Sequence, residues 1–223
     1  MLDPVRFAAE VVRSELERAG IKVGPRIARG HAGDAPVLLK HASRPLSEIV
    51  QVMNLNSNNF YAEQLLKATG GKALGAPGTT AKGLKVAGAL LTRSGARAGS
   101  FRLANGSGLM AGTSVSPVHL VKLLDRLHSL PWLERAVHDS LPVAGLNGTL
   151  AKRLGGTVAA GRVRAKTGTI HQVSCLMGYV EAPAGKPPIL FAIIHNGFTS
   201  SHGAVRKVQD RIVTLLSRYL LSR

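Results

Sequence analysis

Two short groups of polar residues in this 223-residue chain could carry chemistry. The first, Lys166-Thr167-Gly168-Thr169, places one cation and two hydroxyls around a glycine, where the backbone is open to close approach by a ligand. A cation flanked by hydroxyl donors suits a carboxylate. Motifs this short also recur by chance, here as an ordinary strand with a solvated lysine and a bulge glycine. A second motif is therefore needed before a site can be predicted.

That second motif is the S-x-N element Ser57-Asn58-Asn59. It lies in a polar break, residues 54–59, between two predicted helices, and packing on both sides of such a junction can aim a hydroxyl. An S-x-N element followed later by Lys-Thr-Gly is the paired signature of penicillin-recognising serine acyltransferases. The pair therefore favours acyl-transfer chemistry over an ordinary strand.

Four blocks along the chain carry a resemblance to the larger low-molecular-mass penicillin-binding proteins, the D-alanyl-D-alanine carboxypeptidase/endopeptidase family. Residues 43–66 resemble that family's segment around S-D-N, residues 105–109 its D-G-S-G-L, residues 145–150 its G-x-D-G-T-L, and residues 165–180 its Lys-Thr-Gly strand. The chain differs from the family at three positions where aspartate is usual, because it has Asn58, Asn105 and Asn147 there.

A larger difference concerns the nucleophile. In the family it is the serine of an S-x-x-K motif well before the S-x-N element, and no serine in this chain is followed by lysine three residues on. Thr79-Thr80-Ala81-Lys82 is the nearest imitation, and it favours a helix N-cap with a solvated lysine. The start of the chain also lacks a signal-peptide pattern. We therefore expect the nucleophile and the export information to belong to sequence outside this chain.

The resemblance implies roles for the residues that are present. Ser57 would relay a proton to or from the leaving D-alanine, Asn59 would hold the substrate amide, and Lys166 would supply positive potential. Thr167 and Thr169 would bind the terminal carboxylate beside Gly168, and the Thr169 N–H would serve the oxyanion. The implied partners are peptidoglycan stem peptides ending in D-Ala-D-Ala, and β-lactams if the enzyme is complete. The implied location is periplasmic or extracytoplasmic, and no cofactor or metal is implied.

Composition leaves two alternatives open. The chain carries 29 Lys and Arg against 12 Asp and Glu, a net charge of +17 that attracts polyanions. One alternative is a non-catalytic remnant that binds peptidoglycan or anionic envelope polymers. The other, a nucleic-acid-binding domain, is disfavoured because aromatic residues make up only 4% and the basic residues are scattered. Cys175 is expected to be a packed thiol, with His171 on the same strand but too distant to act as its base.

The predicted fold class is α/β, with a transpeptidase-like antiparallel sheet packed between helices and incomplete at its N-terminal side. Residues 1–40 are expected to be the tail of an accessory region with a helix and short strands, and residues 41–223 the C-terminal part of the catalytic domain. Predicted helices cover residues 4–19, 45–55, 60–69, 80–93, 117–130 and 201–220. Predicted strands cover residues 21–23, 37–39, 162–180 and 189–195, the last two as a hairpin, and Gly70, Gly71, Gly75 and Gly78 are expected in a loop.

Overall fold

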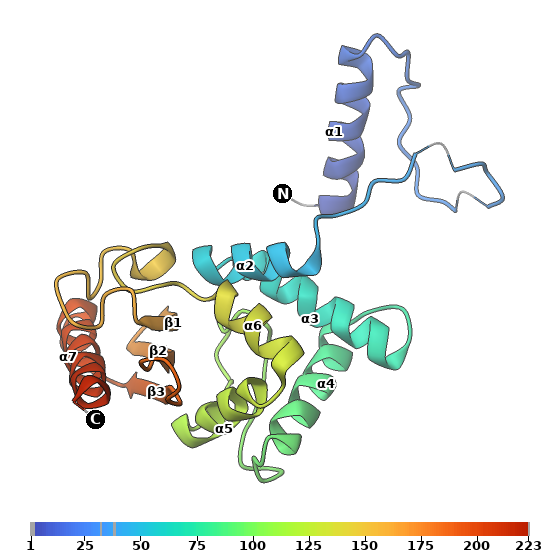
Figure 1. Ribbon diagram of the computed structural model, residues 1–223. Coiled ribbons are helices and arrows are strands. Elements are labelled where there is room, and N and C mark those ends of the chain that lie inside the picture. Colours follow the sequence, from blue (N-terminus) through green and yellow to red (C-terminus); the bar gives the residue numbers. More distant parts are fainter. Residues whose placement is uncertain (1–2, 32, 38, 223) are drawn as a thin grey trace. The chain divides into compact units, whose positions relative to one another are not determined.

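The computed structural model describes residues 3–31, 33–37 and 39–222 (Figure 1). The chain divides into two compact units, Met1–Ser43 and Arg44–Arg223. In the first unit, helix α1 (Pro4–Arg18) begins where Asp3 accepts hydrogen bonds from the N–H groups of the first turn. The short strands predicted in this unit are wrong, because residues 21–23, 37 and 39 have no strand pairing, while residue 38 lies outside the described residues.

The second unit contains a three-stranded antiparallel sheet in the order β1-β2-β3, formed by β1 (Val163–Ile170), β2 (Val173–Val180) and β3 (Ile189–Asn196). The prediction of one strand over residues 162–180 is wrong, because the chain reverses at His171 and Gln172, where Gln172 has φ +52°. β-Branched residues on both sides of this polar pair hid the turn. His171 thus lies in the turn, and Cys175 lies opposite Gly168 on the neighbouring strand.

Helices cover both faces of the sheet, as predicted (Figure 1). Successive side chains of a strand point to opposite faces. Leu176 on β2 accordingly packs in one core cluster with Val213 of α7 (His202–Leu221). Tyr179 packs in the other cluster, with Leu124 of α5 (Pro117–His128). Leu176 and Val213 are both fully buried, so this α7 side forms the larger hydrophobic core.

Helix α7 is rotated relative to the sequence prediction. The apolar spacing in residues 201–220 predicts that six apolar side chains face inward. Val205 is buried and Leu216 packs against the core, as this spacing predicts, but the other four are exposed by 37–53%: Val208, Ile212, Leu215 and Tyr219. The buried positions include Gln209, whose Nε2 donates to Ser174 Oγ on β2 over 3.1 Å. An apolar count misses such a face, because hydrogen-bonded polar residues occupy it.

Helices α2 (Leu46–Asn56), α3 (Asn59–Leu74) and α4 (Thr80–Arg93) form a consecutive run. Gly70 and Gly71 belong to α3, so their placement in a loop is wrong. Gly70 on α3 and Gly83 on α4 serve close helix packing: a Cβ on Gly70 would overlap the backbone nitrogen of Gly83, and one on Gly83 would overlap the carbonyl oxygen of Leu66. The chain therefore needs glycine here for packing rather than for a turn.

Two elements had no counterpart in the sequence prediction, helix α6 (Pro131–Ser140) and the short 3-10 helix η1 (Gly148–Leu150). Helix α6 packs on α2, where Asn54 Nδ2 donates to Ser140 Oγ over 2.7 Å. The start of η1 packs against the end of α2, since a Cβ on Gly148 would lie 2.9 Å from the Leu55 carbonyl oxygen. These contacts bring the end of α2 beside β1.

Candidate active site

Ser57 lies at the junction of α2 and α3, as the C-cap of α2, with φ +51° and ψ +48°. The next residue, Asn58, is the N-cap of α3, and its Oδ1 accepts a hydrogen bond from Tyr61 N over 3.0 Å. A non-glycine residue in this left-handed region costs on the order of 1 kcal/mol, and such residues cluster at functional sites. The junction thus holds the exposed Ser57 in a conformation set by helices on both sides.

Lys166 reaches this junction from β1. Its Nζ donates to Ser57 Oγ over 2.8 Å and to the carbonyl oxygen of Thr167 over 2.7 Å. The two residues are 109 positions apart in the sequence. The two motifs singled out in the sequence therefore meet in space.

The surroundings of Lys166 leave its charge without a carboxylate. Among the ion pairs of the described residues, none involves Lys166, and both of its hydrogen-bond acceptors are neutral oxygens. Burial lowers the pKa of the Lys166 ammonium, because water is partly excluded from the charged form. A half-buried, unpaired ammonium is suited to receive an anion.

Thr167 contacts Thr149, a residue to which the sequence analysis gave no role. Its Oγ1 lies 2.9 Å from Thr149 Oγ1 on η1, and the two hydroxyls form a hydrogen bond. Thr149 belongs to the block at residues 145–150 that carried part of the resemblance, but it received no predicted role. The two threonines are 18 positions apart in the sequence, and no local motif indicated that their hydroxyls would pair.

Thr169 has a cationic neighbour from the C-terminal helix. Arg206 Nη2 on α7 donates to Thr169 Oγ1 over 3.4 Å, and His202 Nε2 lies 3.1 Å from the carbonyl oxygen of Ile170. The same helical spacing predicts that Arg206 points outward, and it is exposed. It nevertheless lies at the strand, so a second positive charge accompanies Lys166 at this edge of the sheet.

The outer edge of β1 changes character along its length. Its first residues are covered, because Ala165 N donates to the Pro142 carbonyl oxygen and Ala144 N donates to the Val163 carbonyl oxygen. Backbone groups alternate in direction along a strand, so the N–H groups of Thr167 and Thr169 also point to this outer edge, away from β2. Gly168 adds no side chain there, and its position faces the Cβ of Cys175 across the β1–β2 pair. This part of the edge offers hydroxyls and backbone donors together.

Asn59 lies exposed in the first turn of α3, two residues from Ser57. The three asparagines at the usual aspartate positions all accept backbone hydrogen bonds through Oδ1: Asn58 from Tyr61 N, Asn105 from Gly108 N and Asn147 from Val143 N. An aspartate oxygen could accept the same bonds. These asparagines therefore fulfil loop-fixing roles that require no negative charge.

Thr79 is the N-cap of α4, as predicted, and its Oγ1 accepts a hydrogen bond from Lys82 N over 3.2 Å. The expectation of a solvated Lys82 is wrong, because its Nζ donates to the carbonyl oxygens of Gly75 over 2.6 Å and Pro77 over 3.0 Å. The ammonium of Lys82 thus fixes the preceding loop, and the hydrogen bond to the Thr79 hydroxyl comes from the Lys82 backbone N–H.

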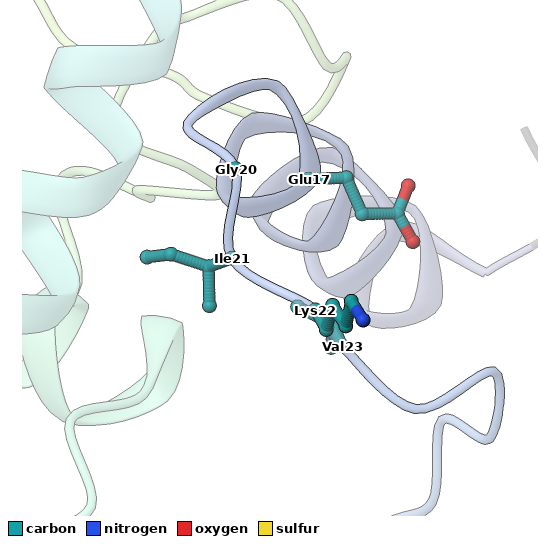
Figure 2. Close-up of a pocket in the computed structure, with 5 residues that line it drawn as sticks. All are labelled: Glu17, Gly20, Ile21, Lys22 and Val23. Atoms are coloured by element: carbon teal, nitrogen blue, oxygen red, sulfur yellow. The ribbon is translucent and has the colours of Figure 1, made fainter.

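Other parts of the described chain offer less chemistry. Figure 2 shows a hollow at the end of α1, lined by Glu17, Gly20, Ile21, Lys22 and Val23, where the side chains of Glu17 and Ile21 point to different sides. Within the described residues no group of three or more His, Cys, Asp or Glu side chains is arranged to hold a metal. Of the helices described, none combines the length and apolar character needed to cross a bilayer.

Comparison with known proteins identifies a family. The model of the D-Ala-D-Ala carboxypeptidase 3 (S13) family matches residues 1–219. The chain is 38% identical over 226 residues to a D-alanyl-D-alanine carboxypeptidase of Actinomadura sp. (strain R39), a match that covers 97% of this chain and 41% of that protein. It is 28% identical over 205 residues to the D-alanyl-D-alanine carboxypeptidase DacB of Haemophilus influenzae, covering 87% of this chain and 41% of that protein.

Solved structures share the fold. Penicillin-binding protein 4 from Haemophilus influenzae, complexed with a β-lactam, superposes with a TM-score of 0.82 at 24% identity, over 94% of this chain and 50% of that one. This likeness confirms the predicted transpeptidase-like α/β fold. The chain spans about two fifths of the length of the two curated relatives described above.

Proposed function

Because this chain belongs to the D-Ala-D-Ala carboxypeptidase 3 (S13) family, we propose that it forms the carboxylate-recognising part of a serine-type D-alanyl-D-alanine carboxypeptidase or endopeptidase. The proposed substrates are peptidoglycan stem peptides ending in D-Ala-D-Ala, with β-lactams as inhibitors and an extracytoplasmic site of action. The observation that carries the proposal is the 2.8 Å hydrogen bond from Lys166 to Ser57, which joins the two motifs.

In this proposal the edge of β1 binds the end of the substrate. The terminal carboxylate accepts hydrogen bonds from Thr167 and Thr169, and the unpaired positive charge of Lys166 strengthens the attraction. Asn59 holds an amide of the peptide. The Thr169 N–H points to the outer edge, where it can donate to the oxyanion that develops on the scissile carbonyl.

Ser57 is proposed to move the proton. Its Oγ accepts from Lys166, which leaves its own O–H free to donate to the amine of the departing D-alanine. During acylation the nucleophile's Oγ loses its proton and bonds to the carbonyl carbon, and the C–N bond to D-alanine breaks. Ser57 gives its own proton to the amine and takes up the one that the nucleophile releases. Water then hydrolyses the ester. We place the nucleophile, the serine of an S-x-x-K motif, on a segment outside these 223 residues.

A labelled β-lactam tests the missing nucleophile. The chain alone should form no stable acyl adduct, as judged by intact-protein mass spectrometry. A second polypeptide, made from the part of the Actinomadura relative that this chain does not match, should acquire the label when this chain is present, and it should acquire less when this chain carries Lys166→Met. Covalent label on any residue of the chain by itself, Thr79 included, would overturn the placement of the nucleophile elsewhere.

A peptide titration tests recognition without catalysis. Diacetyl-L-Lys-D-Ala-D-Ala should shift the backbone amide signals of Thr167 and Thr169 in NMR spectra, while the same peptide with a C-terminal amide should shift them less. Equal shifts from both peptides would contradict carboxylate recognition. Shifts produced only by anionic polymers, and lost steeply with salt, would support the non-catalytic alternative instead.

A further inference from the structure

A surface hollow lies between α2 and α6, away from the Lys166 site. Its volume is about 360 Å³, and it is lined by Ser47, Glu48, Gln51, Trp132, Arg135, Ala136, Asp139 and Ser140. Trp132 is the only tryptophan of the chain, and 76% of its surface is exposed. Leaving so large an aromatic side chain in water forgoes the stabilisation that its burial would give. The hollow therefore presents a flat apolar surface available to a ligand.

Polar side chains with planar groups surround this surface. The lining includes the carboxylates of Glu48 and Asp139 and the amide of Gln51, whose Nε2 lies 3.5 Å from the Asp139 carbonyl oxygen. Arg135 Nε lies 3.5 Å from Asp139 Oδ2, and its side chain is 90% exposed. A pyranose ring has one apolar C–H face and a rim of hydroxyl or acetamido groups. An indole face with amide and carboxylate groups beside it matches that distribution of apolar and polar atoms.

The position of the hollow along α2 fits one particular sugar. Glu48 precedes Ser57 by nine residues, which on a helix of 1.5 Å rise corresponds to about 14 Å. An extended peptide covers about 3.4 Å per residue, so about four residues span the same distance. A stem peptide whose terminal carboxylate lies at Lys166 can therefore bring its sugar-bearing end close to Trp132.

We propose that the α2–α6 hollow binds the amino-sugar at the root of the stem peptide, with Trp132 stacked on the pyranose face. This inference rests on the proposed function, because the span of about 14 Å is counted along α2 from Ser57 of the peptide site. The hollow would then bind the glycan part of the same substrate, so that this chain would bind both ends of the stem peptide. The ligand class is an N-acetylated amino-sugar, such as the N-acetylglucosaminyl–N-acetylmuramyl disaccharide.

The single tryptophan provides a direct measurement on the 223-residue chain. The disaccharide without peptide and the disaccharide-pentapeptide should both shift the fluorescence of Trp132 to shorter wavelength, and the free pentapeptide should not. By calorimetry the disaccharide-pentapeptide should bind at least about fivefold more tightly than the free pentapeptide, which is about 1 kcal/mol. Trp132→Ala should abolish this advantage, and Trp132→Phe should keep part of it.

Leu215→Ala, which removes an exposed apolar side chain from α7, is the matched control and should leave the advantage intact. Equal affinities for the free pentapeptide and its disaccharide form, or an equal fluorescence response to maltose, would overturn the amino-sugar site. Peptide binding at Thr167 and Thr169 would then still stand by the NMR titration. Conversely, a disaccharide response without any peptide-induced NMR shift would count against the peptide site and would leave the sugar site supported.

Discussion

Arg164 and Lys166 are two cations on one strand, separated by a single residue, and strand alternation puts their side chains on the same face of the sheet. Arg164 Nε lies 3.9 Å from Glu181 Oε1, and that carboxylate also pairs with His138. Lys166 contacts only neutral oxygens. The neighbouring positions thus differ in whether the protein itself supplies the counter-charge.

The region around Arg164 is a closed set of charges. Hydrogen bonding from His138 lowers the pKa of the Glu181 carboxyl, and the same contact raises the pKa of His138. Beside them, burial raises the pKa of Tyr179 to about 12, so the phenol stays neutral. A charge compensated within the fold serves stability. A charge left without a partner, such as that of Lys166, costs stability and is available for a ligand.

Lys166→Met should have the largest effect, because it removes the cation for which the protein supplies no counter-charge. A charge-assisted hydrogen bond is worth about 1.5–3 kcal/mol, so affinity for diacetyl-L-Lys-D-Ala-D-Ala should fall by about tenfold or more. The same substitution removes a half-buried ammonium whose charged form is disfavoured, so the free energy of unfolding at neutral pH should rise by about 1 kcal/mol. Calorimetry and urea denaturation measure the two effects.

Lys152→Ala is the control, because this lysine is exposed and its removal subtracts the same formal charge. It should change neither affinity nor stability appreciably. Equal losses of affinity in the two variants, or a difference that added salt removes, would mean that the basic residues act as a diffuse field. Lys166 would then have no specific role.

The second prediction concerns His138 and Glu181 and is a dependence of the free energy of unfolding on pH. The raised pKa of His138 contributes stability fully below its usual value of 6.5, and this contribution is lost as pH rises through the folded-state pKa. The lowered pKa of Glu181 contributes stability fully above its usual value of 4.5, and this contribution is lost as pH falls through the folded-state pKa. The contribution of the pair should therefore be greatest between about pH 4.5 and 6.5.

Urea denaturation at a series of pH values measures this profile. His138→Gln should lower the free energy of unfolding by about 1 kcal/mol near pH 5.5 and by less near pH 8. His31→Gln, at an exposed position of the first unit, should leave the profile unchanged. A loss of equal size at both pH values would show that packing of the His138 ring, rather than its charge, stabilises the fold.

The same contrast explains what the sequence could predict. Ser57 and Lys166 were found because both motifs are local strings, and helix α4 was predicted with its exact bounds, because Thr79 and apolar periodicity mark it. Arg206 and Thr149 were missed, because their contacts with Thr169 and Thr167 form only when α7 and η1 fold against β1. Apolar periodicity also predicted the wrong buried face for α7, because it cannot anticipate that Gln209 is buried and hydrogen-bonded to Ser174.

A substitution at the open end of β1 should have the smallest effect of the three. Thr149→Val removes the hydroxyl that pairs with Thr167. When a carboxylate binds, Thr167 must turn its O–H to the ligand, and Thr149 can then donate its own proton to Thr167 Oγ1. Losing this support should weaken binding of diacetyl-L-Lys-D-Ala-D-Ala by about fivefold, or about 1 kcal/mol.

Thr149→Ser separates this hydroxyl effect from a change in packing, because serine keeps the O–H and loses only a methyl group. Peptide affinity measured by NMR titration should return close to that of the unchanged chain in the serine variant, and the amidated peptide should bind all three forms alike. Because the exposed pair of hydroxyls contributes little to the core, the melting temperatures should also agree. If serine and valine weakened binding equally, the shape of η1 rather than its hydroxyl would orient Thr167. The open end of β1 would then depend on packing, as the Arg164 end depends on its charges.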